Sequence, residues 1–224
     1  MLIIKNVAKL LQEGSFNFKD IISPSYINLK NPKYLEIDNY YYTGIIAVNY
    51  NREYEDLLLR SLIETNINMT ISIFYEKLDK FKVLKELTFN IGNVGVELRH
   101  GNENRQDIDI AMTSYNDAKY IRKEIQTKGE DVYYFYIYIV LFEEDKKILK
   151  YNVEKIEGLL QSKGIQTKNA IFRQEEMFKS CLPLAYNSND LKQVAKRNIL
   201  TSGLTGLYPF ISTSIFEEKG IYYG

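Results

Sequence analysis

The eleven-residue run "VYYFYIYIVLF" at residues 132–142 constrains the fold more than any other part of the sequence. It has the length and the β-branched and aromatic composition of a strand, and it is too short for the roughly 20 residues of a membrane-spanning helix. Its side chains alternate between two faces. One face holds Tyr133, Phe135, Ile137, Ile139 and Leu141, and the other holds Val132, Tyr134, Tyr136, Tyr138 and Val140. We predict a central strand here and expect no transmembrane segment in this chain.

This strand begins the second of two strand–helix–strand units. The segments of the first unit are residues 40–50, 52–64 and 68–78, and those of the second are residues 132–142, 144–164 and 167–178. The second helix carries Ile148, Leu149, Val153, Ile156, Leu159 and Leu160 at helical spacing, and Gly164 suits the left-handed position after its end. Tandem units of this kind predict an α+β fold, a ferredoxin-like βαββαβ antiparallel sheet with helices on one side.

Three further segments surround this pattern. Residues 79–131 are too long for a loop and predict a helical insertion, with helices at 80–87 and 114–129 and the least structured part at 90–106. Turn signals at Pro24 and Asn31-Pro32 predict a small N-terminal β hairpin. The expected domains are an N-terminal β subdomain (residues 1–38), a ferredoxin-like domain with its insertion (39–187), and a C-terminal helix at 190–204 with a connector (188–224).

Charge and motif content exclude several classes of function. Lys plus Arg and Asp plus Glu both total 29, so no overall field draws the chain to nucleic acid. Cys181 and His100 are the only cysteine and histidine, which excludes an intrachain disulfide and a His/Cys metal cluster within one chain. The sequence contains no G-x-x-x-x-G-K-[ST], G-x-G-x-x-G or G-x-S-x-G motif. We expect no catalytic, cofactor-binding or metal-binding residue here.

Two groups of reactive side chains have alternative interpretations. A Cys181–His100 dyad would make a small thiol-dependent enzyme, but a lone cysteine beside Leu182 and Pro183 is more typical of a small buried hydrophobe. The acidic clusters are better explained by helix capping and solvation than by acid–base pairs or a Mg²⁺ site. These clusters are residues 143–145, 175–176 and 217–218.

The tyrosines of the central strand predict a contact surface. If helices cover only the other face, Tyr134, Tyr136 and Tyr138 are left for docking another domain or protein, because tyrosine combines apolar area with a polar tip. An RRM-like module that stacks single-stranded nucleic acid on these rings is an alternative, although the basic-aromatic signature of that module is missing. Packing against the chain's own N-terminal strands is the third interpretation.

Four ordered elements lie near the C-terminal end. They are Phe178, Ser180, Leu182 and Pro183 (Phe-x-Ser-x-Leu-Pro), then Arg197, Leu200 and Thr201, then Pro209 and Phe210, then Gly220 and Gly224. In order and spacing they resemble the segment that precedes the Walker A motif in VirB4-like ATPases of type IV secretion and conjugation systems, the CagE, TrbE and VirB4 family. The resemblance extends upstream through "DIISPSYINLK" and residues 115–144.

This resemblance implies a non-catalytic N-terminal domain of an ATPase that energises conjugative DNA transfer. The protein would continue past Gly224 into a motor domain that uses ATP and Mg²⁺. The domain would dock that motor on the cytoplasmic face of the membrane, contact a VirB3-like small membrane subunit and contribute to an oligomer. The connector would comprise Tyr208, Pro209, Phe210, Ile215, Phe216, Gly220 and Gly224. The AT-rich codon bias suggested by abundant Lys, Ile, Asn and Tyr fits a Gram-positive host.

Overall fold

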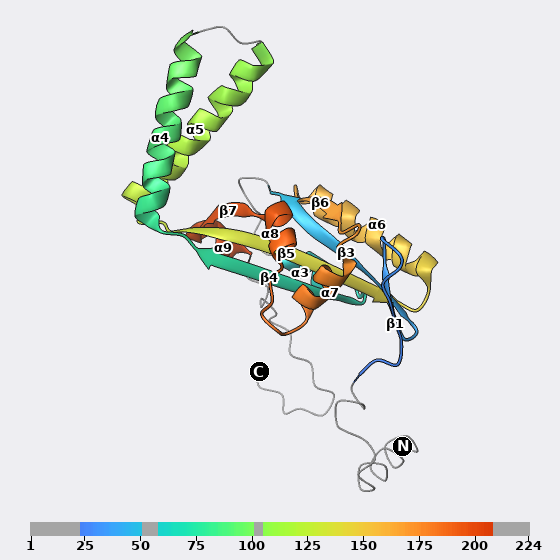
Figure 1. The fold of residues 1–224 in the computed structure, drawn as a ribbon. Helices are drawn as coiled ribbons and strands as arrows, with labels where there is room; N and C mark the ends of the chain where they lie inside the picture. Colours follow the sequence, from blue (N-terminus) through green and yellow to red (C-terminus); the bar gives the residue numbers. More distant parts are fainter. Residues whose placement is uncertain (1–22, 51–57, 101–104, 208–224) are drawn as a thin grey trace, which may run out of the picture.

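The computed structural model describes residues 23–50, 58–100 and 105–207, which form an α+β fold on one seven-stranded antiparallel sheet (Figure 1). The strands are β1 Ile27–Asn28, β2 Leu35–Ile37, β3 Tyr40–Asn49, β4 Met69–Lys77, β5 Val132–Glu143, β6 Gln166–Asn169 and β7 Arg197–Leu200. The helices are α3 Leu58–Ile63, α4 Lys80–His100, α5 Arg105–Thr127, α6 Lys146–Ser162, α7 Gln174–Cys181, α8 Asn189–Ala195 and α9 Thr201–Gly206.

Strand β5 lies at the centre of the sheet, as the sequence predicts. One edge of β5 pairs with β4 from Met69 to Lys77. Its other edge pairs with β3 near the C-terminal end of β5 and with β7 near the N-terminal end. The far edge of β3 pairs with β2 and with β6. The middle of the sheet therefore has the strand order β6, β3, β5, β4.

Helices cover both faces of the sheet, so the expectation of helices on one side is wrong. On one face, Phe135, Ile137 and Ile139 pack against α6, together with Leu62 of α3. On the other face, Tyr136 and Tyr138 pack against α7 and α8. The second layer exists because residues 174–178, expected at the end of a strand, belong to α7. Glu175 and Glu176 in its first turn favour the helix N-terminus.

Helix α6 confirms the prediction of an amphipathic helix after β5. The Asp145 carboxylate accepts hydrogen bonds from the backbone N–H groups of Lys147 (2.6 Å) and Ile148 (3.2 Å), so Asp145 is the N-cap. Gly164 has φ +78° after the last turn, which confirms its predicted position. Ile148, expected on the buried face, is instead 53% exposed.

The insertion between β4 and β5 forms a helical arm, defined as α4 with α5, which projects from one end of the sheet (Figure 1). Both helices are longer than expected: α4 continues through residues 90–100, which we expected to be the least structured, and α5 starts at Arg105. Ile91 of α4 and Ile125 of α5 are buried, and α4 packs against α5, which supplies the packing that extends both helices. Gly129, with φ +72°, follows α5 as predicted.

The prediction of a single C-terminal helix at residues 190–204 is wrong. The chain forms α8, then β7, then α9, and β7 pairs with Val132 to Phe135 of β5. The open edge of β5 offers unpaired backbone groups beside β3, and pairing them outweighs the helical preference of this stretch. The predicted helix at residues 52–64 is described from Leu58 onward only.

The predicted N-terminal hairpin is present as β1 and β2, which extend the same sheet. β2 passes into β3 through a two-residue turn in which Asp38 has φ +51°. The Asp38 carboxylate accepts backbone hydrogen bonds from Ser25 (2.8 Å) and Tyr26 (3.1 Å). Among the described residues, no helix combines the length and hydrophobicity that crossing a bilayer requires.

Candidate functional site: a docking patch and the base of the arm

The predicted tyrosine surface is mostly interior. Tyr136 and Tyr138 are 1% and 0% exposed beneath α7 and α8. The Tyr138 hydroxyl donates to Asn187 Oδ1 at 2.8 Å, and the Tyr136 hydroxyl donates to Glu76 Oε2 at 3.4 Å. Burial raises the pKa of Tyr138 above its ordinary value, and burial followed by the Glu76 charge raises the pKa of Tyr136 to about 12. These rings pack the core, which leaves no stacking platform at Tyr136 and Tyr138.

Tyr134, the third predicted tyrosine, is partly exposed. The Lys196 ammonium lies 3.7 Å from the centroid of its ring, a cation–π contact. A second cation on this side, Lys192, forms an ion pair with Glu76 of β4. Through Lys192 and Lys196, α8 and the residue before β7 therefore contact strands β4 and β5 of the sheet.

Cys181 has the properties of a core residue. It is 8% exposed, and burial raises the pKa of its thiol to about 11. A catalytic thiol needs an accessible and easily formed thiolate, so the environment of Cys181 does not favour nucleophilic chemistry. The side chain of His100 lies outside the described residues, as does the cluster at 217–218.

The other acidic clusters serve the helices. Asp145 caps α6, and Glu143 Oε1 accepts a hydrogen bond from Asn152 at 3.0 Å. Glu175 pairs with Lys179 at 2.5 Å within α7. In the described part of the chain, no group of three or more His, Cys, Asp and Glu side chains is placed to hold a metal ion.

The most unusual exposed residue is Phe172, between β6 and α7. It is 81% exposed and has φ +63°, a left-handed conformation that bulky side chains rarely adopt. Its backbone N–H donates to Pro32 O at 2.9 Å, which ties it to the N-terminal hairpin. Phe172, Pro32 and Leu29, which we call the Phe172 patch, line one cleft of about 180 Å³.

Backbone strain that exposes an aromatic ring indicates a site where the ring is used. Leu29 is also 51% exposed, so the patch presents two large apolar side chains to solvent. No sequence signal identified Phe172, because its exposure depends on a backbone conformation set by the contact with Pro32. From composition alone, a phenylalanine between a strand and a helix is not predicted to be a binding residue.

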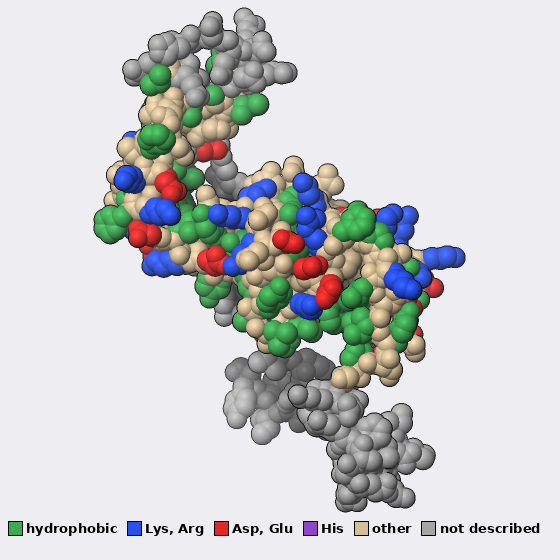
Figure 2. Space-filling view, in the orientation of Figure 1, with side chains coloured by type: hydrophobic (Ala, Val, Ile, Leu, Met, Phe, Trp, Pro, Cys, Tyr) green, Lys and Arg blue, Asp and Glu red, His purple; other side chains and the backbone are tan. Residues whose placement is uncertain are grey.

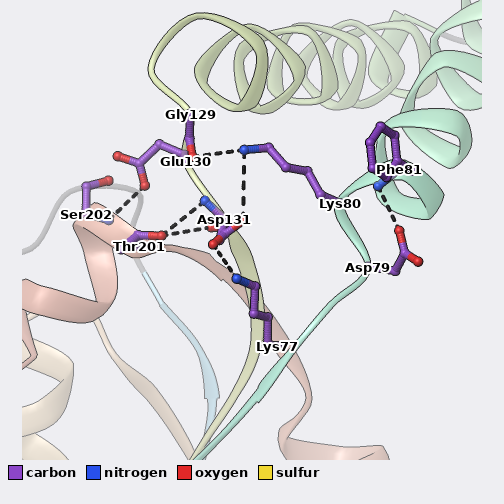
Figure 3. A network of polar contacts seen from close by, with 9 residues as sticks. All are labelled: Lys77, Asp79, Lys80, Phe81, Gly129, Glu130, Asp131, Thr201 and Ser202. Atoms are coloured by element: carbon purple, nitrogen blue, oxygen red, sulfur yellow. Dashed lines mark hydrogen bonds and ion pairs between the residues drawn. The ribbon is translucent and has the colours of Figure 1, made fainter.

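A polar network joins the base of the arm to the C-terminal part of the chain (Figure 3). Asp131 Oδ2 lies 2.6 Å from Lys77 Nζ, and Asp131 Oδ1 lies 3.9 Å from Lys80 Nζ. The hydrogen bond from Lys77 is the main cause that holds the pKa of Asp131 below its ordinary value. Asp79 caps the start of α4 by accepting from the backbone N–H of Phe81 at 2.8 Å.

The same network reaches α9. The Thr201 backbone N–H donates to Asp131 O at 3.1 Å, and the Asp131 backbone N–H donates to the Thr201 hydroxyl at 3.1 Å. The Ser202 backbone N–H donates to Glu130 Oε2 at 3.0 Å. The seven residues predicted as a connector follow α9 but lie outside the described residues: Tyr208, Pro209, Phe210, Ile215, Phe216, Gly220 and Gly224.

Comparison with known proteins identifies one family. The model of a family described as "CagE, TrbE, VirB family, component of type IV transporter system" matches residues 25–190, about three quarters of the chain. The match includes the hairpin, the arm, the Phe172 patch and the start of α8. No curated protein matches the chain.

Proposed function

Because this chain belongs to the CagE, TrbE, VirB family of type IV transporter components, we propose that it is the docking and assembly domain of a VirB4-like ATPase that energises conjugative DNA transfer. The family match over residues 25–190 carries the proposal. The sequence has no G-x-x-x-x-G-K-[ST] phosphate-binding loop. In this proposal, nucleotide and metal belong to a motor domain to which this domain is linked.

The strand order supports a ferredoxin-like core. In a βαββαβ fold the fourth strand lies beside the first, and the third lies between the first and the second. With β3, β4, β5 and β6 taken as these four strands, the order β6, β3, β5, β4 meets that condition. Helices α3 and α6 provide the two crossovers, and the arm is the insertion between the halves.

The docking role is assigned to the Phe172 patch. The partner in this proposal is the cytoplasmic part of a VirB3-like small membrane subunit, which would hold the domain peripherally on the inner face of the membrane. An exposed aromatic ring beside a cleft is a typical anchor for a protein partner. Residue Phe172 is the strongest candidate because its left-handed backbone directs a large apolar side chain into solvent.

Binding to the membrane subunit tests the proposal. The purified chain is titrated against the labelled VirB3-like subunit of the same secretion system in detergent micelles, and the dissociation constant is measured by fluorescence anisotropy. We expect saturable binding that weakens at least tenfold in F172S. The matched control is Y151S, which removes an equally accessible ring (64% exposed) from α6 and should change affinity less than twofold. Absence of binding, or equal loss in both variants, would contradict the docking role.

A second measurement tests the non-catalytic part. The chain should release no phosphate from ATP with Mg²⁺ above a buffer control, and fluorescent ATP should show no saturable binding. Turnover that a substitution within this chain abolishes would overturn the assignment.

A further inference from the structure

The arm carries more apolar surface than its two helices can bury against each other. α4 and α5 have 21 and 23 residues, which corresponds to lengths of about 32 Å and 35 Å. Between them, a Cβ added at Gly95 would lie 3.6 Å from the Tyr115 ring, so the helices approach closely at these two residues. Ile91 and Ile125 are buried in the arm. This packing uses one face of each helix.

Helix α4 has a second apolar face that nothing in the described structure covers. Phe81, Phe89 and Val96 are 84%, 68% and 52% exposed. At 100° per residue these three positions lie within about 80° of each other on the helix surface. We call them the α4 stripe. A helix with apolar residues on two separate faces is typical of one that packs against two neighbours, and α5 is only one of them.

Charge is distributed unevenly along the arm (Figure 2). The part near the sheet, residues 80–90 and 116–128, has seven basic and three acidic side chains: Lys80, Lys82, Lys85, Lys119, Arg122, Lys123 and Lys128 against Glu86, Asp117 and Glu124. Farther out, residues 91–96 and 108–115 contain one charged residue, Asp109. That outer part also exposes Ile110 and Met112 by 65% and 51%. The ligand of this arm must therefore match an apolar outer part and a basic inner part.

The basic and apolar groups meet on α4 itself. Lys82, Lys85, Glu86 and Phe89 line one shallow depression, in which the two lysines outnumber the single glutamate. A second copy of this chain would bring another set of lysines to the same place, so like charges oppose pairing of two arms side by side. Insertion of the arm end into a bilayer is opposed by the segment "ELRHGNENRQD" at 97–107, which has five charged residues. Charge complementarity selects an acidic partner.

We propose that the α4 stripe binds an amphipathic helix of a partner protein, with apolar residues against Phe81, Phe89 and Val96 and acidic residues beside Lys82 and Lys85. The bound helix completes a three-helix bundle with α4 and α5. This surface is separate from the Phe172 patch, which lies with the hairpin at the opposite end of β5 (Figure 1). It extends the proposed docking function, and its test does not involve the membrane subunit.

The test uses two synthetic fluorescein-labelled peptides of 24 residues. Both peptides have leucine at helical spacing on one face. The remaining positions are glutamate in the first peptide, called acidic, and lysine in the second. Fluorescence anisotropy with the 224-residue chain should show saturable binding of the acidic peptide only. The variant F81S/F89S should weaken this binding at least tenfold, and K82E/K85E at least fivefold. The control Y120S removes a 57%-exposed ring from α5 and should change affinity less than twofold.

Circular dichroism confirms that each variant folds, and several outcomes overturn the proposal. These are no binding of the acidic peptide, equal binding of both peptides, or unchanged binding by F81S/F89S. Sedimentation equilibrium tests whether a second copy of the chain binds the α4 stripe. A dimer that dissociates in F81S/F89S would assign the stripe to self-association. Flotation with vesicles of phosphatidylcholine and phosphatidylglycerol tests lipid: binding lost in F81S/F89S assigns the stripe to a membrane surface.

Discussion

The Lys77 ammonium donates a hydrogen bond to the Asp131 carboxylate, with Lys77 Nζ 2.6 Å from Asp131 Oδ2. This pair joins the end of β4 to the start of β5 at the place where the chain leaves the sheet for the arm and returns from it. The backbone of Asp131 also forms two hydrogen bonds with Thr201, one with its backbone N–H and one with its hydroxyl, so the orientation of the arm base is coupled to the start of α9.

The pH dependence of stability should show this ion pair. The hydrogen bond from Lys77 holds the folded-state pKa of Asp131 below its ordinary value, so the stabilisation is fully present above the ordinary pKa and is lost as pH falls through the lowered pKa. D131N should therefore be less stable than the wild type at pH 7, and the difference should shrink as pH falls below the ordinary pKa of an aspartate. Urea unfolding at each pH measures it. D109N, at an exposed position of α5, is the control that should show no such difference.

Cys181 should react only in unfolded molecules. With a thiol pKa of about 11, roughly one thiol in a thousand is ionised at pH 8, and the side chain is buried. Reaction with DTNB at pH 8 should be slow in buffer and complete within seconds in concentrated urea. Fast modification of the folded chain would contradict the assignment of Cys181 to the core.

The Tyr138 hydroxyl should contribute measurably to stability. Y138F removes the hydrogen bond to Asn187 Oδ1 and leaves that oxygen without this donor, at a cost of about 1 kcal/mol. Urea unfolding of Y138F measures the loss, and Y151F on the exposed surface of α6 should be neutral. Equal stability of Y138F and the wild type would show that the contact with Asn187 contributes nothing.

Gly44 should not tolerate a side chain. A Cβ at this position of β3 would lie 2.8 to 2.9 Å from three side-chain atoms of Met177, including its Cβ, which cannot rotate away. G44A should therefore destabilise the fold by about 1–3 kcal/mol through overpacking. In G44A/M177A only the Met177 Cβ contact persists, so the double variant should lose less than the sum of the two single variants. Full additivity would show that the two sites are independent.

The sequence predicts those elements whose pattern is local and sets their own boundaries. The run at 132–142 alternates strictly and forms β5, and α6 has an apolar face, a capping acid and Gly164 after its end. The sequence predicts both helices of the arm, but the predicted ranges are shorter than α4 and α5. The reason is that Ile91 joins the buried face only when α5 lies opposite. Periodicity thus predicts which elements exist, but it does not predict their ends where contacts with a neighbouring element extend them.

The missed elements depend on tertiary contacts. β7 is four residues long and forms because β5 has an open edge, which no pattern at 197–200 reveals. The faces of Tyr136 and Tyr138 were predicted correctly, but their exposure depended on α7 and α8, which cover them from 36 or more positions along the chain. The candidate docking residue Phe172 has no sequence signal, because its φ of +63° arises where the chain meets Pro32.

Phe172 should show opposing effects on stability and on docking. A left-handed conformation costs a residue with a Cβ about 1–2 kcal/mol relative to glycine, so F172G should be more stable than F172A by about 1 kcal/mol. Both variants lack the aromatic ring, so both should lose affinity for the membrane subunit to the same extent. Urea unfolding gives the stability difference, and anisotropy gives the affinities.

Two outcomes would contradict this account of Phe172. If F172G is the less stable of the two variants, the backbone at this position is not strained. If only F172G loses affinity, the backbone conformation rather than the ring directs docking. The comparison of these two variants therefore separates the contribution of Phe172 to partner affinity from its effect on the free energy of unfolding.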